Sequence, residues 1–420
     1  MGSEIPSDWI TDKLGNLGVF KSAGADKKES TSETPIGLVN YMDVYRNTKI
    51  DNSFEWMRVT AKPAEIQKCN LLKGDILFTP SSETPDDIGH SAVVVEDIKD
   101  AIFSYHLVRL RLHNQELLDL DFRRYFLNHY PIAKYFHSRA TGITRYTLSR
   151  NDFRNCVVSF PKDINEQRTI ASILSKVDEA IAATKNSIAK AERLKKALMQ
   201  NLLAGKLKPD GTWRKEDEFY KDEKFGNVPI GWEVKMVKEL AINLDNKRKP
   251  IKAEDRHFMK GQYRYYGAAG IIDYIDKYIF EGKYILFGED GENLLSRKLP
   301  QAFIVEGQFW VNNHAHILEP IYNVADIDFL CYQLEFKDYR NIVYGSAQPK
   351  INKSDLNKIK ILTPNDTKEQ KAIADKILTI EKTLENKQNK IQKLERLKKA
   401  LMQNLLTGKV RVKIKETVNG

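Results

Sequence analysis

Few residue patterns in this sequence could do chemistry by themselves. Pro85-Asp86 followed by Asp97-Ile98-Lys99 fits the loose arrangement of two carboxylates and a lysine that surrounds a metal ion in many nucleases. The pattern is short and common by chance, and residues 228–363, which we interpret below as a second globular part of the chain, contain no counterpart. We therefore expect solvated loop acids here rather than nuclease chemistry.

A pair of histidines could in principle bind a metal ion. His314-x-His316 would place both rings on one face of a strand, because successive side chains of a strand point to opposite faces. Two histidines without further ligands are weak evidence for a metal site. We expect ordinary polar strand positions and no metal.

The motifs of nucleotide-using enzymes are missing from the sequence. Gly205-Lys206 and Gly282-Lys283 are followed by Leu and Tyr, so neither forms a phosphate-binding loop. There is no Gly-x-Gly-x-x-Gly after a strand, and no Pro-Pro pair, which the Asn/Asp-Pro-Pro-aromatic motif of amino-methylating DNA methyltransferases requires. The sequence predicts a binding protein without a catalytic centre or cofactor.

Composition limits the setting in which the chain works. Its 420 residues carry a net charge of +10, which favours an acidic partner. The basic excess lies on two helical parts and the C-terminal tail, where it forms either a solvated helix face or a ridge facing phosphates or an acidic subunit. Three widely separated cysteines fit a reducing cytoplasm, and no apolar run is long enough to span a membrane.

The sequence contains an internal repeat. Glu192–Leu203 and Glu395–Leu406 both read ERLKKALMQNLL, and the same offset relates Glu166-Gln167 to Glu369-Gln370. A weaker match relates Pro6-x-x-Trp9 to Pro229-x-x-Trp232. The layout is therefore globular part, helix, globular part, helix, in which the helices are near copies and the globular parts share only a skeleton.

Each helical part has the apolar spacing of a coiled coil. It begins after a proline and ends before a glycine, and its seam has a polar interruption at Thr184 or Lys387. The residues expected to pair the helices are Ile170, Leu174, Val177, Ile181, Ile188, Ile373, Ile377, Ile380, Leu384, Ile391 and Leu394.

The direction of the two helices can be argued from their length. A helix of about 38 residues is about 57 Å long, whereas the globular part that joins the two helices should be under about 40 Å across. Parallel helices would need that part to carry the chain back along the whole helix. We therefore expect an antiparallel pair with a pseudo-twofold axis; the alternative is two independent helical hairpins or linkers.

The globular parts are mixed and strand-rich, which makes the fold class α+β. We expect helices at 115–138 and 324–341, and strands at Asp75–Thr79, Ser91–Glu96, Ser104–Leu112, Tyr284–Phe287, Ala302–Val305 and His314–Leu318. The expected divisions are a first globular domain at 1–160, a long helix at 161–207, a linker at 208–227, a second globular domain at 228–363, a second long helix at 364–410 and a basic tail at 411–420.

Each long helix opens with Glu-Gln and closes with the repeated ERLKKALMQNLL followed by x-Gly-Lys, and Gly226–Trp232 forms the entry to the second domain. Together with the layout, these features resemble the specificity subunits of type I restriction–modification enzymes. The resemblance covers essentially the whole chain. It implies that the two globular domains are target-recognition domains, each reading one half of a bipartite DNA site. The helices would be conserved spacers that dock two modification subunits.

The resemblance also implies a division of labour. The modification subunits would bind S-adenosylmethionine and methylate adenine at N6, and restriction subunits would carry ATP-driven translocation and cleavage. This chain would be a cytoplasmic, non-catalytic targeting subunit whose direct partners are double-stranded DNA and the modification subunits. The rival hypothesis is an architectural protein that spaces two protein partners without reading DNA.

The residues that would read bases are polar or basic and lie in loops beside shared skeleton positions, where arginine suits guanine and asparagine or glutamine suits adenine. A solvated loop role stays open for each. The candidates are Ser81, Ser82, His90, Arg139, Thr144, Arg145, Arg264, Tyr265, Tyr266, Arg297, Asn313, His314, Gln348 and Lys350.

The repeated helix ends have an apolar arc wider than a two-helix seam needs. It either packs onto the chain's own globular domains or docks a modification subunit, presented twice. The residues concerned are Leu194, Leu198, Met199, Leu202, Leu203, Leu397, Leu401, Met402, Leu405 and Leu406.

Overall fold

The computed structural model describes residues 5–22, 24–27, 29–343 and 349–413. The chain forms two compact units, one made of Met1–Lys185 with Lys390–Gly420 and the other of Asn186–Asn389. Each unit thus contains one globular part, the first part of the long helix that follows it, and the last part of the other long helix. Among the described residues, no helix has the length and apolar character needed to cross a membrane.

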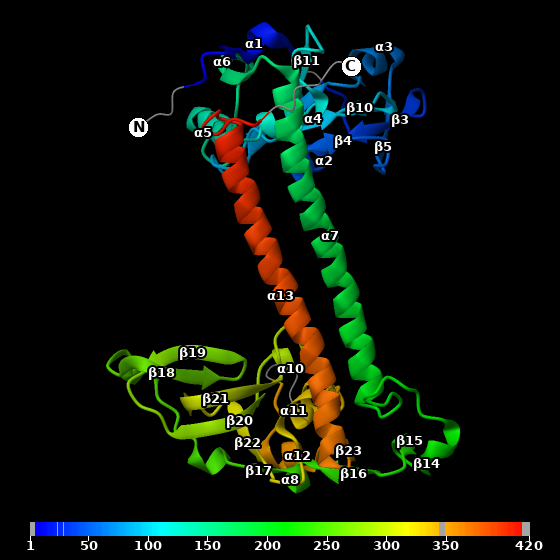
Figure 1. Cartoon of the computed structure of the whole chain (residues 1–420), viewed down its shortest axis with the longest axis vertical. Helices are drawn as coiled ribbons and strands as arrows, with labels where there is room; N and C mark the ends of the chain where they lie inside the picture. The colour runs from blue at the N-terminus through cyan, green and yellow to red at the C-terminus, as the bar shows by residue number, and fades with distance from the viewer. Residues whose placement is uncertain (1–4, 23, 28, 344–348, 414–420) are drawn as a thin grey trace. The chain divides into compact units, whose positions relative to one another are not determined.

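The described globular part of the first unit combines short helices with four small sheets, drawn from blue to blue-green in Figure 1. Its helices are α1 (Leu14–Leu17), α2 (Tyr41–Arg46), α3 (Pro63–Lys68), α4 (Leu120–Phe126), α5 (Tyr130–Arg139) and α6 (Arg150–Asn155). Its strands are β1 (Trp9–Lys13), β2 (Gly18–Lys21), β3 (Thr34–Val39), β4 (Lys49–Ile50), β5 (Met57–Ala61), β6 (Asn70–Leu71), β7 (Ile76–Phe78), β8 (Ser81–Ser82), β9 (Ser91–Val94), β10 (Ile98–Phe103), β11 (Val108–Leu112), β12 (Tyr146–Thr147) and β13 (Val157–Pro161).

The two larger sheets of this unit have the strand orders β5-β3-β10-β6 and β2-β11-β7-β9-β4. Alternate residues of β7 serve different cores, as the two faces of a strand require. Ile76 and Phe78 pack with the helices of the unit, while Leu77 packs with β3, β5 and β10.

The second unit is built around one six-stranded sheet, with the order β17-β22-β20-β21-β18-β19 (Figure 1). Its helices are η1 (Glu216–Glu218), α8 (Val237–Leu240), η2 (Asp245–Lys247), α9 (Ala253–His257), α10 (Asn293–Ser296), α11 (Ile327–Phe336) and α12 (Lys353–Lys358). Its strands are β14 (Phe219–Asp222), β15 (Gly226–Pro229), β16 (Trp232–Met236), β17 (Ala241–Asn243), β18 (Lys260–Gly267), β19 (Gly270–Ile275), β20 (Phe280–Gly288), β21 (Ala302–Val311), β22 (Ala315–Pro320) and β23 (Lys360–Pro364). Helix α11 packs on this sheet through Leu330 and Leu334.

Both units share a frame that the sequence repeat indicated. β1 pairs antiparallel with β13, and β16 pairs antiparallel with β23; in each pair the tryptophan lies opposite the proline that precedes a long helix (Trp9 with Pro161, Trp232 with Pro364). Short helices follow in matching places, α1 and α6 in the first unit and α8 and α12 in the second. The remaining sheets of the two units differ in strand number and order.

The long helices are α7 (Ile164–Leu202) and α13 (Thr367–Leu405). Helix α7 ends because Gly205 takes a left-handed conformation (φ +66°), which a residue with a side chain adopts only at a cost. The two helices pack together and run antiparallel: in the second unit, Lys195 pairs with Glu381 and the earlier Ser187 with the later Lys387. The predicted α+β class with two long antiparallel helices is confirmed.

The repeated Glu-Gln has a structural role in each unit. Gln167 donates a hydrogen bond to Pro161 O (2.8 Å) and accepts one from Asp119 N (2.7 Å). Gln370 repeats this with Pro364 O (2.9 Å) and Asp326 N (2.8 Å). Each glutamine therefore joins the start of a long helix to both the frame strand and a domain helix.

Some element boundaries differ from the sequence-based expectation. Ser104–Leu112 is not one strand, because Leu107 N donates to Ser104 O (3.0 Å) and turns the chain before β11 begins. The helix expected at 115–138 is two helices, since α4 ends at Phe126 and α5 begins at Tyr130 with Pro131 in its first turn. The segment 208–227 contains η1 and most of the β14–β15 hairpin.

Candidate nucleic-acid interface

The first unit brings four of the candidate residues together. β8, which is Ser81 and Ser82, pairs with β12, and Arg145 Nη2 donates to Ser81 Oγ (3.2 Å). Thr144 and Arg145 are exposed on the loop that enters β12. The loop needs Gly142 (φ +150°), because a Cβ there would lie 2.0 Å from Arg145 O. The result is an exposed loop with a cationic side chain anchored by the Ser81 hydroxyl group.

His90 belongs to a second polar group in the first unit. Its Nε2 lies 2.7 Å from Asp87 Oδ1, and Tyr45 donates to the other oxygen of the same carboxylate (2.8 Å). Burial works against ionisation of Asp87, but the hydrogen bonds from His90 and Tyr45 outweigh it and lower its pKa. Sequence reasoning missed Tyr45 and Asp87. Arg139 is separate, stacked over the ring of Tyr135 at 5.6 Å.

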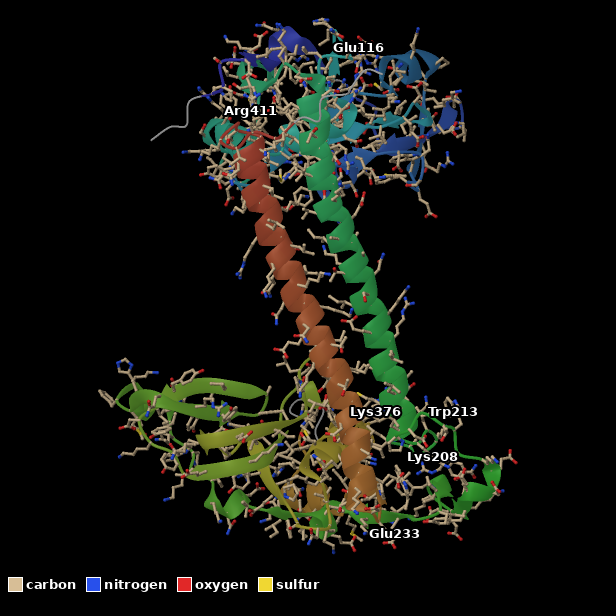
Figure 2. All side chains as sticks on the ribbon, viewed as in Figure 1. Glu116, Lys208, Trp213, Glu233, Lys376 and Arg411 are labelled. Carbon is tan, nitrogen blue, oxygen red and sulfur yellow. The ribbon has the colours of Figure 1, made fainter. Side chains whose placement is uncertain are left out.

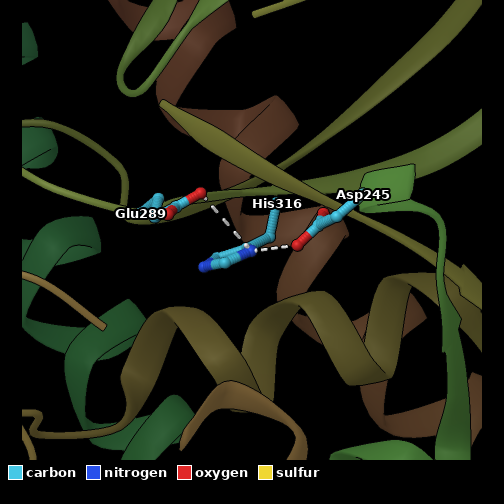
Figure 3. Close-up of side chains that lie close together, drawn as sticks. All are labelled: Asp245, Glu289 and His316. Carbon is cyan, nitrogen blue, oxygen red and sulfur yellow. Dashed lines mark hydrogen bonds and ion pairs between the residues drawn. The ribbon is translucent and has the colours of Figure 1, made fainter. Parts of the chain in front are cut away.

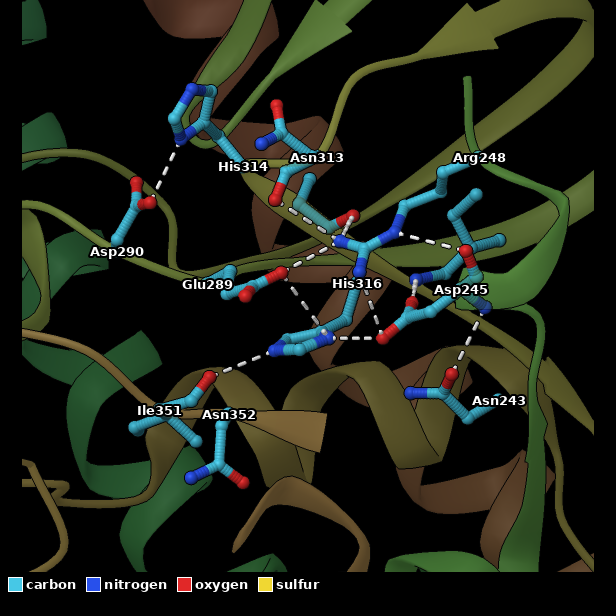
Figure 4. Close-up of polar contacts among 12 residues, drawn as sticks. Asn243, Asp245, Arg248, Glu289, Asp290, Asn313, His314, His316, Ile351 and Asn352 are labelled. Carbon is cyan, nitrogen blue, oxygen red and sulfur yellow. Dashed lines mark hydrogen bonds and ion pairs between the residues drawn. The ribbon is translucent and has the colours of Figure 1, made fainter. Parts of the chain in front are cut away.

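In the second unit, Asn313 and His314 lie on the loop between β21 and β22 (Figure 4), and both are exposed, as is Lys350. His314 Nδ1 lies 2.8 Å from Asp290 Oδ2, and Lys350 Nζ lies 3.0 Å from Glu289 Oε1. Asp290 and Lys350 also form a backbone bridge. The candidate Gln348 lies outside the described residues.

The other candidates of the second unit are placed less favourably for contacting DNA. Tyr265 and Tyr266 are core residues, 0% and 5% exposed, because β18 lies inside the sheet and both of its faces are covered. Arg264 donates to Glu306 O and lies over the ring of Tyr266. Arg297 has a left-handed backbone (φ 53°) and pairs with Glu335. The structure therefore removes the two tyrosines from the candidate surface.

His316 lies at the centre of a buried charged group with Asp245 and Glu289, shown in Figure 3. Its Nδ1 is 2.6 Å from Asp245 Oδ2 and 3.8 Å from Glu289 Oε2, and its Nε2 is 2.8 Å from Ile351 O. The Ile351 carbonyl can only accept, so Nε2 donates to it. The other ring nitrogen shares a hydrogen bond with the Asp245 carboxyl group, which leaves the ring between two acidic side chains and a backbone carbonyl.

Two cations complete this group. Arg248 lies 2.7 Å from Glu289 and 3.3 Å from Asp245, and Lys350 also contacts Glu289. A metal ion would have to displace these cations and take a ring nitrogen that already shares a hydrogen bond with a carboxyl group. The geometry favours an internal ion network over a metal ligand set, and the absence of a metal site stays a prediction.

The ion network predicts that the second unit loses stability in acid. Burial opposes ionisation of Asp245, but its hydrogen bond and charge interaction with His316, together with Arg248, hold its pKa below the ordinary value. Glu289 is shifted in the same direction, with Arg248 and His316 outweighing its burial. A carboxylate with a lowered pKa in the folded state stabilises the fold at neutral pH, and this contribution is lost as the pH falls through the folded-state pKa.

We expect Asp245→Asn to lower the free energy of unfolding by about 1–3 kcal/mol at neutral pH and to flatten its decline as the pH falls below about 5. Urea unfolding followed at several pH values measures this. The exposed carboxylate of Glu254, changed to Gln, is the control and should leave the pH dependence as in the wild type. An Asp245→Asn protein with the wild-type pH slope would refute the ionic assignment.

The helix-pairing candidates are buried or half-buried without exception. Ile170, Leu174, Val177, Ile181, Ile373, Ile377 and Leu384 are buried, and Ile188, Ile380, Ile391 and Leu394 are half-buried. The Thr184 hydroxyl donates to Ala180 O within its own helix, whereas Lys387 Nζ donates to Ser187 Oγ of the other helix (2.8 Å). These placements agree with a seam, and the pairing role stays a prediction for each residue.

One polar triad recurs in both units beside the helix pair. In the first, Tyr125 donates to Asp178 (2.9 Å), which pairs with Lys398 (2.6 Å). In the second, Tyr332 donates to Glu381 (2.6 Å), which pairs with Lys195 (2.7 Å). Each triad joins a domain helix, the long helix that follows that domain, and the end of the other long helix.

The repeated helix ends lie mostly inside the units. Met199, Leu202 and Leu203 pack with Trp232 and Ile373 in the second unit, and Leu405 and Leu406 pack in the core of the first. Leu198, Leu401 and Met402 are half-buried. Leu194 and Leu397, which are equivalent in the repeat, are 48% and 47% exposed and remain available to a partner.

An arginine just beyond each helix end binds the first turn of the other long helix. Arg411 binds both oxygens of Glu166 (2.6 and 2.7 Å) and both of Asp8 (2.9 and 2.7 Å). Arg214 binds Glu369 and lies over the ring of Trp232. The chain that leaves one long helix is thus tied by an arginine to the first turn of the other.

Comparisons with known proteins agree with this architecture. The profile of the type I restriction modification DNA specificity domain matches twice, at residues 6–193 and 229–396. The chain is 27% identical to the MjaX type I restriction enzyme specificity subunit of Methanocaldococcus jannaschii and 26% identical to the MjaVIII specificity subunit of the same organism, covering 98% of this chain and 95% of the relative in both cases.

Solved structures show the same fold at low sequence identity. The S subunit of a type I restriction–modification system from M. genitalium superposes with a TM-score of 0.56 at 16% identity, covering 96% of this chain and 97% of that one. The HsdS subunit of Thermoanaerobacter tengcongensis gives a TM-score of 0.52 at 16% identity, covering 97% and 99%. With two profile matches that together span most of its length, the chain belongs to the family of type I restriction modification DNA specificity domains.

Proposed function

We propose that this chain is the DNA specificity subunit of a type I restriction–modification complex, in which each globular domain reads one half of a bipartite site. The proposal rests on one observation: the two domains share the same framework strands but differ in their other sheets and loops. β1–β13 and β16–β23 keep the same register, whereas the sheets and loops that hold the candidate residues differ between the units. Two different reading surfaces on one frame suit a site with two different halves.

The long helices would set the spacing between the half-sites and dock two modification subunits. Support for docking comes from Leu194 and Leu397, which occupy equivalent positions and are both exposed. The modification subunits would methylate adenine at N6, and restriction subunits would join through the complex. The chain would act in the cytoplasm as a targeting subunit without a cofactor of its own.

The rival function is a scaffold that spaces two partners without reading DNA. Filter binding to a random duplex library, with and without modification subunits, separates the two. Enrichment of particular sequences supports recognition, and binding without enrichment supports the scaffold. Turnover by the purified chain alone, with S-adenosylmethionine or Mg²⁺ on DNA, would contradict the targeting role.

Arg145 is the best-placed candidate of the first domain, because it is exposed and anchored by Ser81. We expect Arg145→Ala to weaken binding at the first half-site by about 1–3 kcal/mol. Competition binding of the assembled complex measures this. Lys62→Ala, an exposed cation at the start of α3, is the control and should bind as the wild type. Wild-type affinity of the Arg145→Ala complex would remove this residue from the interface.

A further inference from the structure

Three loops of the second unit converge beside the ion network (Figure 4). They are Glu289–Asp290 after β20, Asn312–His314 between β21 and β22, and Lys350–Ile351 before α12. Glu289 N donates to His314 O (2.9 Å) and Ile351 N donates to Glu289 O (2.9 Å). The three loops are therefore hydrogen-bonded to one another through their backbones.

Side chains of the ion network donate hydrogen bonds to backbone carbonyls in or next to the same loops. Arg248 Nη1 donates to Asn313 O (3.2 Å) and Ala315 O (2.9 Å), and His316 Nε2 donates to Ile351 O (2.8 Å). Asp245 fixes the other nitrogen of the His316 ring and also accepts from Ile317 N (3.1 Å). Every charged member of the network thus contacts a loop or a residue that holds one.

Stability alone is a poor explanation for such a network. Ions lose hydration when they are buried, and well-packed apolar side chains of similar volume often stabilise a core as well or better. What apolar side chains cannot supply is directional hydrogen bonding to Asn313 O, Ala315 O and Ile351 O. These three carbonyls belong to residues in or next to the loops that display Asn313, His314 and Lys350.

We infer that Arg248, Asp245 and His316 are positioning residues for reading the second half-site. They hold the Asn313–His314 and Lys350 segments in one fixed geometry without touching DNA themselves. The inference rests on the proposed function, because it concerns the accuracy with which one of the two proposed reading surfaces is presented. A reading surface must hold its donors and acceptors closely in place, since small displacements lose paired hydrogen bonds to a base edge.

The test compares His316→Gln and Arg248→Gln with a matched control, Gln333→Leu. Gln333 lies in the same unit, is 8% exposed, and donates to Leu203 O and Leu362 O (both 2.9 Å), away from these loops. For each complex with modification subunits, affinity is measured for the cognate duplex and for duplexes with one base changed in either half-site. The readout is discrimination, the ratio of the cognate to the mismatched affinity, for each half-site.

We expect both network variants to lose about tenfold in discrimination at the second half-site and to keep wild-type discrimination at the first. Gln333→Leu should lower the unfolding midpoint but leave discrimination unchanged at both half-sites. Arg248 lies at the edge of the network, with its side chain 14% exposed, so Arg248→Gln decides the matter if His316→Gln does not fold.

Full discrimination in the network variants, or equal loss at both half-sites, would overturn the inference while leaving the proposed function in place. A loss in Gln333→Leu equal to that in the network variants would overturn it as well, because general destabilisation would then explain the effect. A wild-type complex that discriminates at neither half-site would instead refute the proposed function.

Discussion

Replacing residues 1–160 with the matching part of a related specificity subunit changes one half of the methylated motif and leaves the other half as it was. This result is expected because the described apolar cores of the first unit are built from the first globular part and from the long helices and their ends. The junction falls just before Pro161, the last residue of β13, so all of this frame strand except Pro161 is exchanged together with its partner β1. Mapping of methylated adenines measures the outcome.

The exchange must keep the contacts that the long helices make with the domain. Ile170, Leu174, Leu405 and Leu406 pack in the core of the first unit, and Gln167 joins Pro161 to Asp119. The donor should therefore carry compatible residues at these interfaces. The reciprocal exchange of residues 228–363 is the control and should change only the other half of the motif. A change in both halves from either exchange would refute independent reading.

The second large effect concerns Trp232, which is 2% exposed where α7, α13 and the frame meet in the second unit. Trp232→Ala should lower the free energy of unfolding by about 3–5 kcal/mol, because it removes a large buried ring and leaves a cavity. It also removes the Nε1 hydrogen bond to Glu369 (3.2 Å) and the ring on which Arg214 stacks. Urea unfolding measures the change.

Trp213 provides the matched control for this substitution. It lies in the same unit, beside the C-terminal end of α7 (Figure 2), and its side chain is 63% exposed. Trp213→Ala should change the free energy of unfolding by less than about 0.5 kcal/mol. Equal effects of the two substitutions would contradict the assignment of Trp232 to a core that joins helices and frame.

The sequence predicted the parts of the fold that repeat, because two copies of a pattern reveal what both need. The proline before each long helix, the glycine after it and the apolar seam predicted helices at 161–207 and 364–410; α7 and α13 lie within these ranges, starting three residues later and ending five residues earlier. The Glu-Gln pair was visible as a repeat, but its role was not. Its hydrogen-bond partners, Asp119 and Asp326, lie at helix starts far away in the sequence.

The contacts that could not be predicted join residues without a shared spacing. Arg214 and Arg411 each bind a glutamate in the first turn of the other long helix. They lie at different sequence separations from the repeated helix ends, so the repeat did not reveal them. The pairing of β17 with β22 brings Asp245 to His316, so the sequence showed His316 only as part of the His314-x-His316 pair. The sequence around a single ionisable residue does not show which residue of a distant strand or loop will pair with it.

The candidate surface was predicted in part, and its errors have a physical cause. Tyr265 and Tyr266 were taken as loop residues before a glycine, but β18 is covered on both faces, and neither polarity nor alternation marks such a strand. Tyr265 is satisfied by Ile251 N, which donates to its hydroxyl (3.0 Å). Asn313, His314 and Lys350 are exposed outside the regular strands, although His314 was expected to begin a strand, and their role in reading DNA stays a prediction.

The most direct test of the central claim is to purify this chain from its host with its bound partners and to map the adenines that the complex methylates. The account predicts modification subunits among the partners and a motif of two short specific sequences separated by a non-specific gap of constant length. A complex that methylates without sequence preference, or a single uninterrupted motif, would contradict a chain with two reading domains.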